Sequence, residues 1–331
     1  MFVDARGEVI CQGGAFCEDM LVVDAQRSDE GGVTIKNVAG PSVVGYMDLG
    51  ETAETYEALV LGTADYIRKN GFKQVIIGLS GGIDSSLVAA VAVDAIGAEN
   101  VVGVTMPSRF NSDETISDAG RLAENLGIEF HTIPIADTLD SFDTFLKAID
   151  GWDDKGTAYE NLQARIRGTM LMSLSNQFGY MVITCGNKSE TAVGYSTLYG
   201  DTAGGFAVIK DVPKTMVYKL SRYVNERHGR EIIPITVIER LPSAELREDQ
   251  KDSDSLPDYD LLDGILRGYI EEDKSAEKIV EKGLDCEVVK RIIGLVDRNE
   301  YKRRQSPPGI KITPKAFGRD RRMPITNNYG K

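Results

Sequence analysis

Residues 75–88 read VIIGLSGGIDSSLV, and this stretch decides the fold class. A continuous apolar run predicts a buried strand, the triplet Ser80-Gly81-Gly82 predicts a tight turn, and a helix is expected to begin at about Asp84. This order makes an anion site, because glycines let backbone N–H groups approach phosphate oxygens and the helix N-terminus adds its positive end. The stretch therefore predicts a phosphate-binding loop.

The polar residues of this loop narrow its chemistry. Ser80, Ser85 and Ser86 supply hydroxyl donors, but the pattern GxxxxGK[ST] is absent and no lysine lies nearby, so this is not a Walker loop. Asp84 would repel a bare polyphosphate, and its presence makes sense chiefly as a ligand of Mg²⁺. The alternative is a glycine-rich turn in which Asp84 is a plain N-cap. The complete string SGGIDSS after an apolar strand favours the phosphate site.

Strands and helices alternate through the central part of the chain. The expected strands are residues 74–79, 101–106, 129–135 and 180–184, and the expected helices are residues 51–70, 84–96, 111–126, 157–178 and 213–228. The strands are continuously apolar rather than alternating, which is typical of a parallel sheet that helices cover on both faces. We therefore expect an α/β fold, a doubly wound parallel sheet with flanking helices, completed by C-terminal helices and a short N-terminal β segment.

The two ends of the chain and one internal loop differ from this pattern. Residues 1–27 read as short strands, and residues 28–50 read as a polar linker. Residues 242–260 are acidic, turn-rich and poor in apolar residues, which predicts a mobile loop. Short helices are expected between residues 260 and 298, and residues 301–331 are basic within an acidic chain.

The composition limits the possible partners. Hydrophobic residues make up 42% of the chain and charged residues 27%, as in soluble globular proteins. A net charge of −13 argues against nucleic acid as the main partner. No run of about 18 apolar residues predicts a membrane span. We therefore expect a cytoplasmic protein that binds neither nucleic acid nor membrane.

The cysteines and histidines limit the catalytic chemistry. Cys11, Cys17, Cys185 and Cys286 form no CxxC pair, and with only two histidines in the chain there is no cluster of zinc type. We interpret the cysteines as reduced thiols. Chemistry must therefore rest on phosphate, a metal ion and carboxylates.

The string SGGIDSS resembles the loop of the N-type ATP pyrophosphatases, which have an adenine nucleotide alpha-hydrolase-like fold. Enzymes of that superfamily cleave ATP between the α and β phosphates and activate a carboxylate or carbonyl as an adenylate. Four further stretches resemble the NAD synthetases, and in particular the synthetase domain of the glutamine-dependent enzymes. They are ENLQARIRG (160–168), GNKSETAVGYSTLYG (186–200), FAVIKDVPKTMVYKL (206–220) and EYKRRQSPPGIKITPKAFGRDRRMPITN (300–327).

The resemblance implies a carbon–nitrogen ligase. Its expected reaction is the ATP-dependent amidation of deamido-NAD (nicotinic acid adenine dinucleotide) through an adenylate, which gives NAD, AMP and pyrophosphate. The implied small molecules are ATP as a substrate, Mg²⁺ as a cofactor and ammonia as the nitrogen source. Two alternatives stay open: another adenylating ligase of the superfamily, such as a GMP synthetase-like enzyme, and a nucleotide-binding module without turnover.

The resemblance also implies roles for residues at matching positions. Asp84 and Glu190 would bind Mg²⁺ on the triphosphate, and Asp84, Lys214 and Asp201 would be catalytic. The residues expected to bind ATP are Gly78, Leu79, Ser80, Gly81, Gly82, Ile83, Asp84, Ser85, Ser86, Cys185, Lys214 and Ser243. The residues expected to bind the dinucleotide are Asn161, Arg165, Glu190, Tyr195, Ser196, Thr197, Asp201 and Lys302.

Some of these assignments have a plain alternative. Cys185 and Ser243 stand where the family commonly has threonine, and a thiol is the weaker hydrogen-bond donor, so the contact of Cys185 with ATP stays open. Asn161 and Arg165 lie four residues apart, which places them on one face of a helix. That face could equally be solvated.

The resemblance divides the chain into three parts. Residues 1–27 resemble the end of a nitrilase-like glutaminase domain, residues 28–50 would be the linker, and residues 51–331 would be the synthetase domain. A glutaminase of this kind needs a glutamate, a lysine and a nucleophilic cysteine, which lie earlier in the family's chains. We therefore expect these residues alone to use ammonia, a glutaminase domain or subunit to be a partner, and the protein to form a homodimer.

Overall fold

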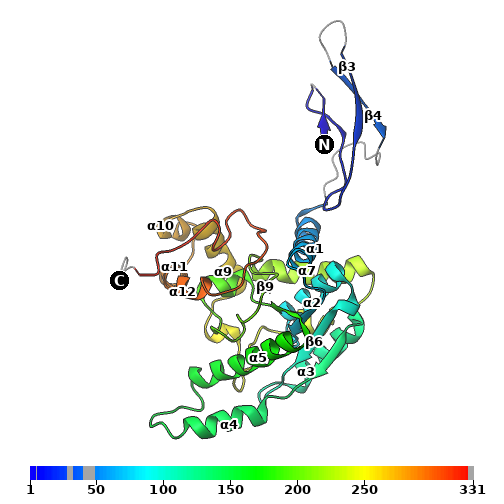
Figure 1. Ribbon diagram of the computed structural model, residues 1–331. Coiled ribbons are helices and arrows are strands. Elements are labelled where there is room, and N and C mark those ends of the chain that lie inside the picture. Colours follow the sequence, from blue (N-terminus) through cyan, green and yellow to red (C-terminus); the bar gives the residue numbers. More distant parts are fainter. Residues whose placement is uncertain (5, 28–32, 40–48, 327–331) are drawn as a thin grey trace.

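The computed structural model describes residues 1–4, 6–27, 33–39 and 49–326 (Figure 1). Its centre is a parallel sheet of five strands in the order β7-β6-β5-β8-β9. The strands are β5 (Val75–Gly78), β6 (Val101–Thr105), β7 (Glu129–Thr132), β8 (Met181–Thr184) and β9 (Phe206–Ala207). This confirms the predicted α/β fold. The sequence did not predict β9, which has only two residues.

The order of the strands creates a switch point beside β5. The chain runs from β5 outward to β6 and β7, and then returns to the opposite side of β5 to form β8 and β9. Ligands of doubly wound sheets bind beyond the carboxyl ends of the strands at such a point. The loop after β5 lies there, so the topology places the predicted phosphate loop where ligands bind.

Helices cover both faces of the sheet, as the apolar strands predict. One face carries α1 (Glu51–Lys69), α2 (Ile83–Ile96), α3 (Asp113–Leu126) and α7 (Lys214–His228), and the other carries α4 (Ala136–Leu146) and α5 (Thr157–Phe178). Each face of the sheet has its own hydrophobic core, and successive side chains of β5 point into one and then the other. Val75 and Ile77 pack on the first face and Ile76 on the second. All three are fully buried.

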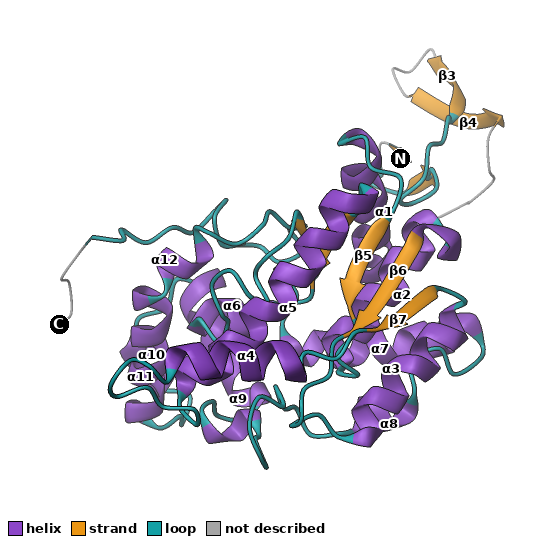
Figure 2. Cartoon of the chain, turned by 60° about the horizontal axis from the view of Figure 1, so that its bottom comes forward, coloured by secondary structure: helices purple, strands orange, loops and turns teal. Residues whose placement is uncertain are grey.

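A second group of helices lies beside the sheet (Figure 2). Its members are α6 (Lys188–Val193), α9 (Tyr259–Leu266), α10 (Ala276–Val280), α11 (Cys286–Arg298) and α12 (Glu300–Arg303). Ala192 and Val193 of α6 pack against Leu262 of α9 and Val289 and Ile292 of α11. The predicted C-terminal helices are therefore confirmed, and they form a core of their own that holds α6.

The remaining short elements connect these layers. They are α8 (Ile235–Glu239), 3₁₀ turns at Ala98–Asn100 and Asp252–Asp254, and a π-helical turn at Arg267–Glu271. None of the helices in the described part of the chain combines the length and apolar composition needed to cross a bilayer.

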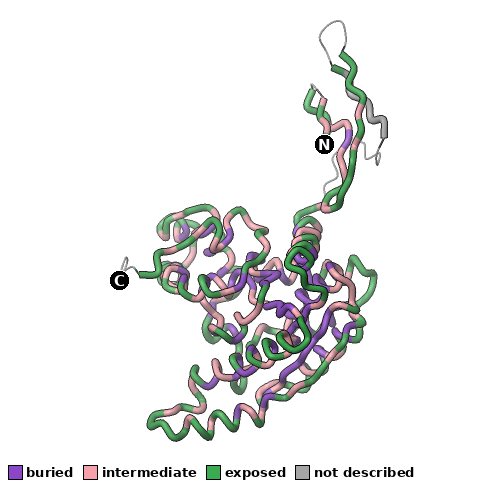
Figure 3. The backbone as a smooth tube through the Cα atoms, viewed as in Figure 1, coloured by how far each residue is buried: buried purple, intermediate pink, exposed green. Residues whose placement is uncertain are grey.

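The first residues form two antiparallel hairpins that project beyond α1 (Figure 1). The strands are β1 (Phe2–Val3) with β2 (Val9–Cys11), and β3 (Val22–Arg27) with β4 (Val33–Ala39). Figure 3 shows that this extension is mostly exposed. Residues 33–39 form a strand although the sequence predicted a linker from 28 to 50, because their backbone pairs with β3. The other parts of that linker, 28–32 and 40–48, lie outside the described residues.

Candidate active site

The turn between β5 and α2 has a backbone that only glycine fits. Gly81 has a φ of +78°, and a Cβ at this position would lie 2.1 Å from the carbonyl oxygen of Thr115. Ser80 Oγ accepts a hydrogen bond from the Gly82 N–H at 3.2 Å. Arg240 donates to the Gly81 carbonyl at 3.1 Å and forms an ion pair with Asp118. The turn is thus fixed from both sides, and the sequence had not singled out Arg240.

The turn borders a cavity of about 340 Å³, within the range of small-molecule sites. Of the residues expected to bind ATP, all but one line it: Gly78, Leu79, Ser80, Gly81, Gly82, Ile83, Asp84, Ser85, Cys185, Lys214 and Ser243. Ser86 is the exception, because it does not line the cavity. It is fully buried, and its hydroxyl donates to the Gly82 carbonyl at 2.9 Å, at the start of its own helix.

Two carboxylates and one ammonium group meet in this cavity. Asp84 comes from α2, Glu190 from α6 and Lys214 from α7. Lys214 Nζ lies 3.4 Å from Glu190 Oε1 and contacts Asp84 Oδ2 more closely. The Lys214 side chain is 3% exposed, and each carboxylate is 18% exposed.

Burial and charge oppose each other in this cluster. Burial raises the pKa of Glu190 to about 8, although Lys214 favours the ionised carboxylate. Burial also disfavours the charge of Lys214, but Asp84 and Glu190 outweigh it and raise the pKa of Lys214. A second positive charge in the cavity would stabilise Glu190 as a carboxylate.

The two carboxylates suit a Mg²⁺ ion that also binds the phosphates of a substrate. Among the described residues, no group of three or more histidines, cysteines or acids could hold a metal ion alone. Mg²⁺ usually keeps several waters and is bound by one or two carboxylates together with substrate phosphates. Asp84 and Glu190 supply those two carboxylates beside a phosphate loop.

Three of the residues expected to bind the dinucleotide lie next to this cluster. Tyr195, Thr197 and Asp201 line the same cavity. Asp201 accepts a hydrogen bond from the Thr197 N–H at 2.6 Å. Lys302 Nζ donates to the carbonyls of Gly194 and Ser196 at 2.8 Å each, so it fixes the segment that carries Tyr195.

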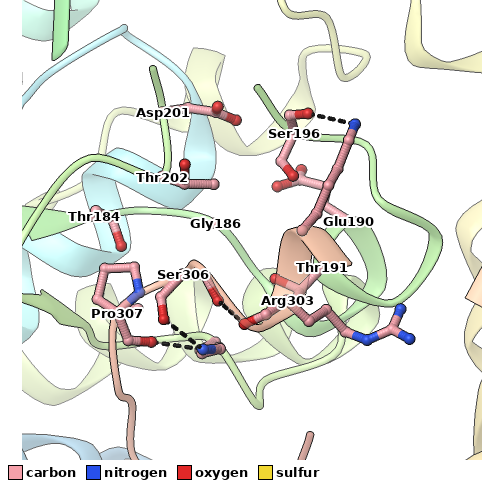
Figure 4. Close-up of a pocket in the computed structure, with 13 residues that line it drawn as sticks. Thr184, Gly186, Glu190, Thr191, Ser196, Asp201, Thr202, Arg303, Ser306 and Pro307 are labelled. Atoms are coloured by element: carbon pink, nitrogen blue, oxygen red, sulfur yellow. Dashed lines mark hydrogen bonds between the residues drawn. The ribbon is translucent and has the colours of Figure 1, made fainter. Parts of the chain in front are cut away.

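A smaller cavity of about 30 Å³ adjoins this segment. Glu190, Ser196 and Asp201 line it (Figure 4). Lys302 lines it as well. Glu190 and Asp201 line both cavities, so the small cavity lies next to the large one. Its volume suits a water-sized molecule.

Two residues expected to bind the dinucleotide lie outside both cavities. Asn161 accepts a hydrogen bond from Thr197 Oγ1 at 2.6 Å, and Arg165 Nε donates to the Leu198 carbonyl at 3.2 Å. Both residues project from one face of α5, as their spacing predicts. That face contacts the backbone and side chains of residues 197–198 and lies outside the cavity lining.

The acidic loop over residues 242–260 holds a site residue that sequence analysis missed. Asp252 is 6% exposed, lines the large cavity, and accepts hydrogen bonds from the hydroxyls of Tyr195 and Tyr259 at 3.3 and 2.8 Å. In the sequence it is one acid among many in a polar run. No pattern marks it, because its burial depends on tyrosines from other segments.

The same loop contacts the opposite wall of the cavity. Glu245 accepts hydrogen bonds from Asn111 Nδ2 at 3.0 Å and from Thr115 Oγ1 at 2.8 Å. Gln163 donates to the Leu246 carbonyl at 2.8 Å. Glu160, near the start of α5, forms an ion pair with Arg247 of this loop at 3.2 Å.

Comparison with known proteins identifies a family and several relatives of this chain. Residues 55–306 match the protein family described as NAD synthase. The chain is 48% identical, over 99% of its length, to the glutamine-dependent NAD(+) synthetase of Thermotoga maritima, of which it spans 61%. The structure of glutamine-dependent NAD+ synthetase from Acinetobacter baumannii in complex with ADP is similar with a TM-score of 0.60 and 47% identity, covering 90% of this chain and 55% of that one.

A shorter protein is also similar. The structure of NMN synthetase from Francisella tularensis gives a TM-score of 0.66 and 27% identity, and covers 77% of this chain and 97% of that one. The chain thus spans only part of the glutamine-dependent relatives but nearly all of this shorter protein's length.

Proposed function

This chain belongs to the NAD synthase family, and we propose that it catalyses the ATP-dependent amidation of deamido-NAD to NAD, with release of AMP and pyrophosphate. One observation carries the proposal: the phosphate loop, the Asp84–Glu190 pair and Lys214 meet in one cavity at the switch point of the sheet. The ADP complex of the A. baumannii relative supports a nucleotide site. The enzymes of this family are carbon–nitrogen ligases.

In the first step, an oxygen of the nicotinate carboxylate attacks the α-phosphorus of ATP. The bond from that phosphorus to the bridging oxygen breaks, and pyrophosphate leaves with the electron pair. Backbone N–H groups of Ser80–Gly82 and the ammonium of Lys214 hold phosphate oxygens and stabilise the developing charge. Mg²⁺ held by Asp84 and Glu190 would neutralise charge on the triphosphate. The step needs no protein nucleophile.

In the second step, ammonia attacks the activated carbonyl carbon. The carbon–oxygen bond to AMP breaks, AMP leaves with the electron pair, and the nitrogen loses a proton. Asp201 borders the water-sized cavity and is held by the Thr197 N–H, so we assign it the role of positioning ammonia and accepting this proton. The adenylate must be kept from water, and the loop over residues 242–260 suits a lid because Glu245 joins it to the opposite wall.

A substrate panel tests this function. Pyrophosphate release from ATP is measured with ammonium and with deamido-NAD, nicotinic acid mononucleotide or xanthosine monophosphate. We expect kcat/KM to be about 10²-fold higher for deamido-NAD, because binding energy from the remote half of the dinucleotide is used at the reacting centre. Faster turnover of the mononucleotide would reassign the protein to the activity of the F. tularensis neighbour. Binding of ATP without turnover of any substrate would indicate a nucleotide-binding module.

The nitrogen source is a separate prediction. We expect a protein of these 331 residues to make NAD from ammonium but not from glutamine at equal concentration, because residues 1–27 carry no glutaminase catalytic set. Only unprotonated ammonia attacks the adenylate, so the rate at fixed total ammonium should rise with pH above neutrality. NAD formation from each nitrogen source across a pH series measures both effects. Robust synthesis from glutamine would reveal a glutaminase site in this chain.

Three further assignments are part of the proposal. We assign residues 1–27 to the end of a glutaminase domain, residues 28–50 to a connector that includes β4, and residues 51–331 to the synthetase domain. A cytoplasmic location is consistent with four cysteines that are all free. We also propose that the protein forms a homodimer.

A further inference from the structure

One residue contacts both acids of the cluster. Asn187 is fully buried and lies at the N-cap of α6. Its Nδ2 donates to Asp84 Oδ1 at 2.9 Å, and its Oδ1 accepts from the Glu190 N–H at 2.9 Å. Its own backbone N–H faces Glu190 Oε2 at 3.5 Å. Two acids that lie 106 positions apart in the sequence are therefore held by a single residue.

The oxygens of the two carboxylates are divided between two partners. Asn187 contacts Asp84 Oδ1 and Glu190 Oε2, whereas Lys214 Nζ contacts Asp84 Oδ2 and Glu190 Oε1. One oxygen of Asp84 thus faces the side-chain amide of Asn187, and one oxygen of Glu190 faces its backbone N–H. The other oxygen of each acid faces the ammonium of Lys214. Only a side chain with both a donor and an acceptor can bind Asp84 and cap α6 at once.

We propose that Asn187 is a positioning residue that holds Asp84 and Glu190 in the orientation in which both acids can reach one cation. The inference rests on the proposed function, which places Mg²⁺ on this pair. Asn187 lies outside the lining of the cavity and acts only through the carboxylates. Without it, Asp84 could rotate about its side-chain bonds, and the two acids would no longer share a fixed point. Groups that orient metal ligands typically change metal affinity or activity by about 10–100-fold when they are removed.

The first variant is Asn187→Ser, which keeps a good N-cap and loses the contact with Asp84. Its matched control is Asp285→Ser at the N-cap of α11, where Asp285 Oδ1 accepts from the Val288 N–H and contacts neither carboxylate. The probe is Mn²⁺, titrated into each protein with an ATP analogue that has a methylene group between the α and β phosphates. No turnover occurs, so bound Mn²⁺ is read directly by electron paramagnetic resonance.

We expect Asn187→Ser to raise the half-saturating Mn²⁺ concentration about 10-fold or more, and Asp285→Ser to leave it unchanged. The thermal unfolding midpoints of the two variants should fall by similar amounts. Equal Mn²⁺ affinity in Asn187→Ser and the wild type overturns the inference. NAD formation by the wild type is measured in parallel, so failure of the proposed function is seen separately as an inactive wild type that still binds Mn²⁺.

A second variant covers the case in which Asn187→Ser does not fold. Asn187→Asp has the same shape and caps helices equally well, but it presents an oxygen to Asp84 Oδ1 instead of a donor. We expect kcat for pyrophosphate release to fall about 10-fold or more while KM for deamido-NAD changes little. A purely structural role would instead give a wild-type kcat in the folded fraction, and that result contradicts the proposal.

Discussion

Asp84→Asn is expected to abolish pyrophosphate release, with a loss in kcat of about 10³-fold or more. A metal ion supplies several kcal/mol of charge stabilisation to such a transition state, and each 1.36 kcal/mol corresponds to about a factor of ten. The replacement keeps the shape of the side chain and removes the only negative charge in the phosphate turn. Its carbonyl oxygen can still accept from Asn187, so the fold should persist. The measurement is pyrophosphate release with saturating deamido-NAD, ATP and Mg²⁺.

The matched control for this substitution lies on the same helix. Asp94 of α2 accepts a hydrogen bond from the Tyr56 hydroxyl at 2.9 Å, far along the helix from the turn. Asp94→Asn makes the same chemical change and should leave turnover within about two-fold, as expected for a site away from the chemistry. If Asp84→Asn kept near-normal turnover with Mg²⁺, the assignment of Asp84 as a metal ligand would be wrong.

Lys214→Met is expected to reduce kcat by about 10²–10³-fold, because one preorganised contact to the developing phosphate charge is lost. KM for deamido-NAD should change much less, since the contact strengthens only in the transition state. The variant should also be less stable, because Asp84 and Glu190 are left facing each other without a positive charge; breaking a buried ion pair in this way costs about 3 kcal/mol or more.

The stability of Lys214→Met should depend on pH. Burial already raises the pKa of Glu190 to about 8 in the presence of Lys214, and removing the lysine raises it further. A carboxyl group with a raised pKa is most favourable when protonated, so the variant should lose stability as pH rises from about 5 to 8. Chemical denaturation at the two pH values measures this. A variant that is equally stable at both, with unchanged kcat and a raised KM, would assign Lys214 to substrate binding alone.

The features that the sequence predicts are those set by neighbouring residues. The apolar run before Ser80 predicts a buried strand at any position in a sheet, and Gly81 marks a backbone conformation that other residues avoid. Ser86 shows where this local reasoning ends. It follows Ser85 by one position, and a turn of about 100° per helical residue places its side chain in the protein interior instead of at the cavity.

The features that the sequence does not predict depend on contacts between distant segments. Asp252 becomes a buried site residue only because Tyr195 and Tyr259 pack over it. Arg240 donates to the Gly81 carbonyl although the two residues lie 159 positions apart. No sequence pattern around either residue indicates this contact. The spacing of Asn161 and Arg165 correctly places them on one face, but the position of that face relative to the cavity is a property of the whole fold.

The packing of α6, the helix that carries Glu190, against the C-terminal helices has a consequence for protein synthesis. Asp84 lies at the start of α2, just after strand β5 of the sheet. Helix α6 with Glu190 is instead held by the core that α9 and α11 form from residues 259–298. On the ribosome, the phosphate turn emerges roughly two hundred residues before the helices that fix its partner carboxylate, and domains fold only as their residues become available. A half-made chain therefore lacks the assembled carboxylate pair on which the proposed cleavage of ATP depends.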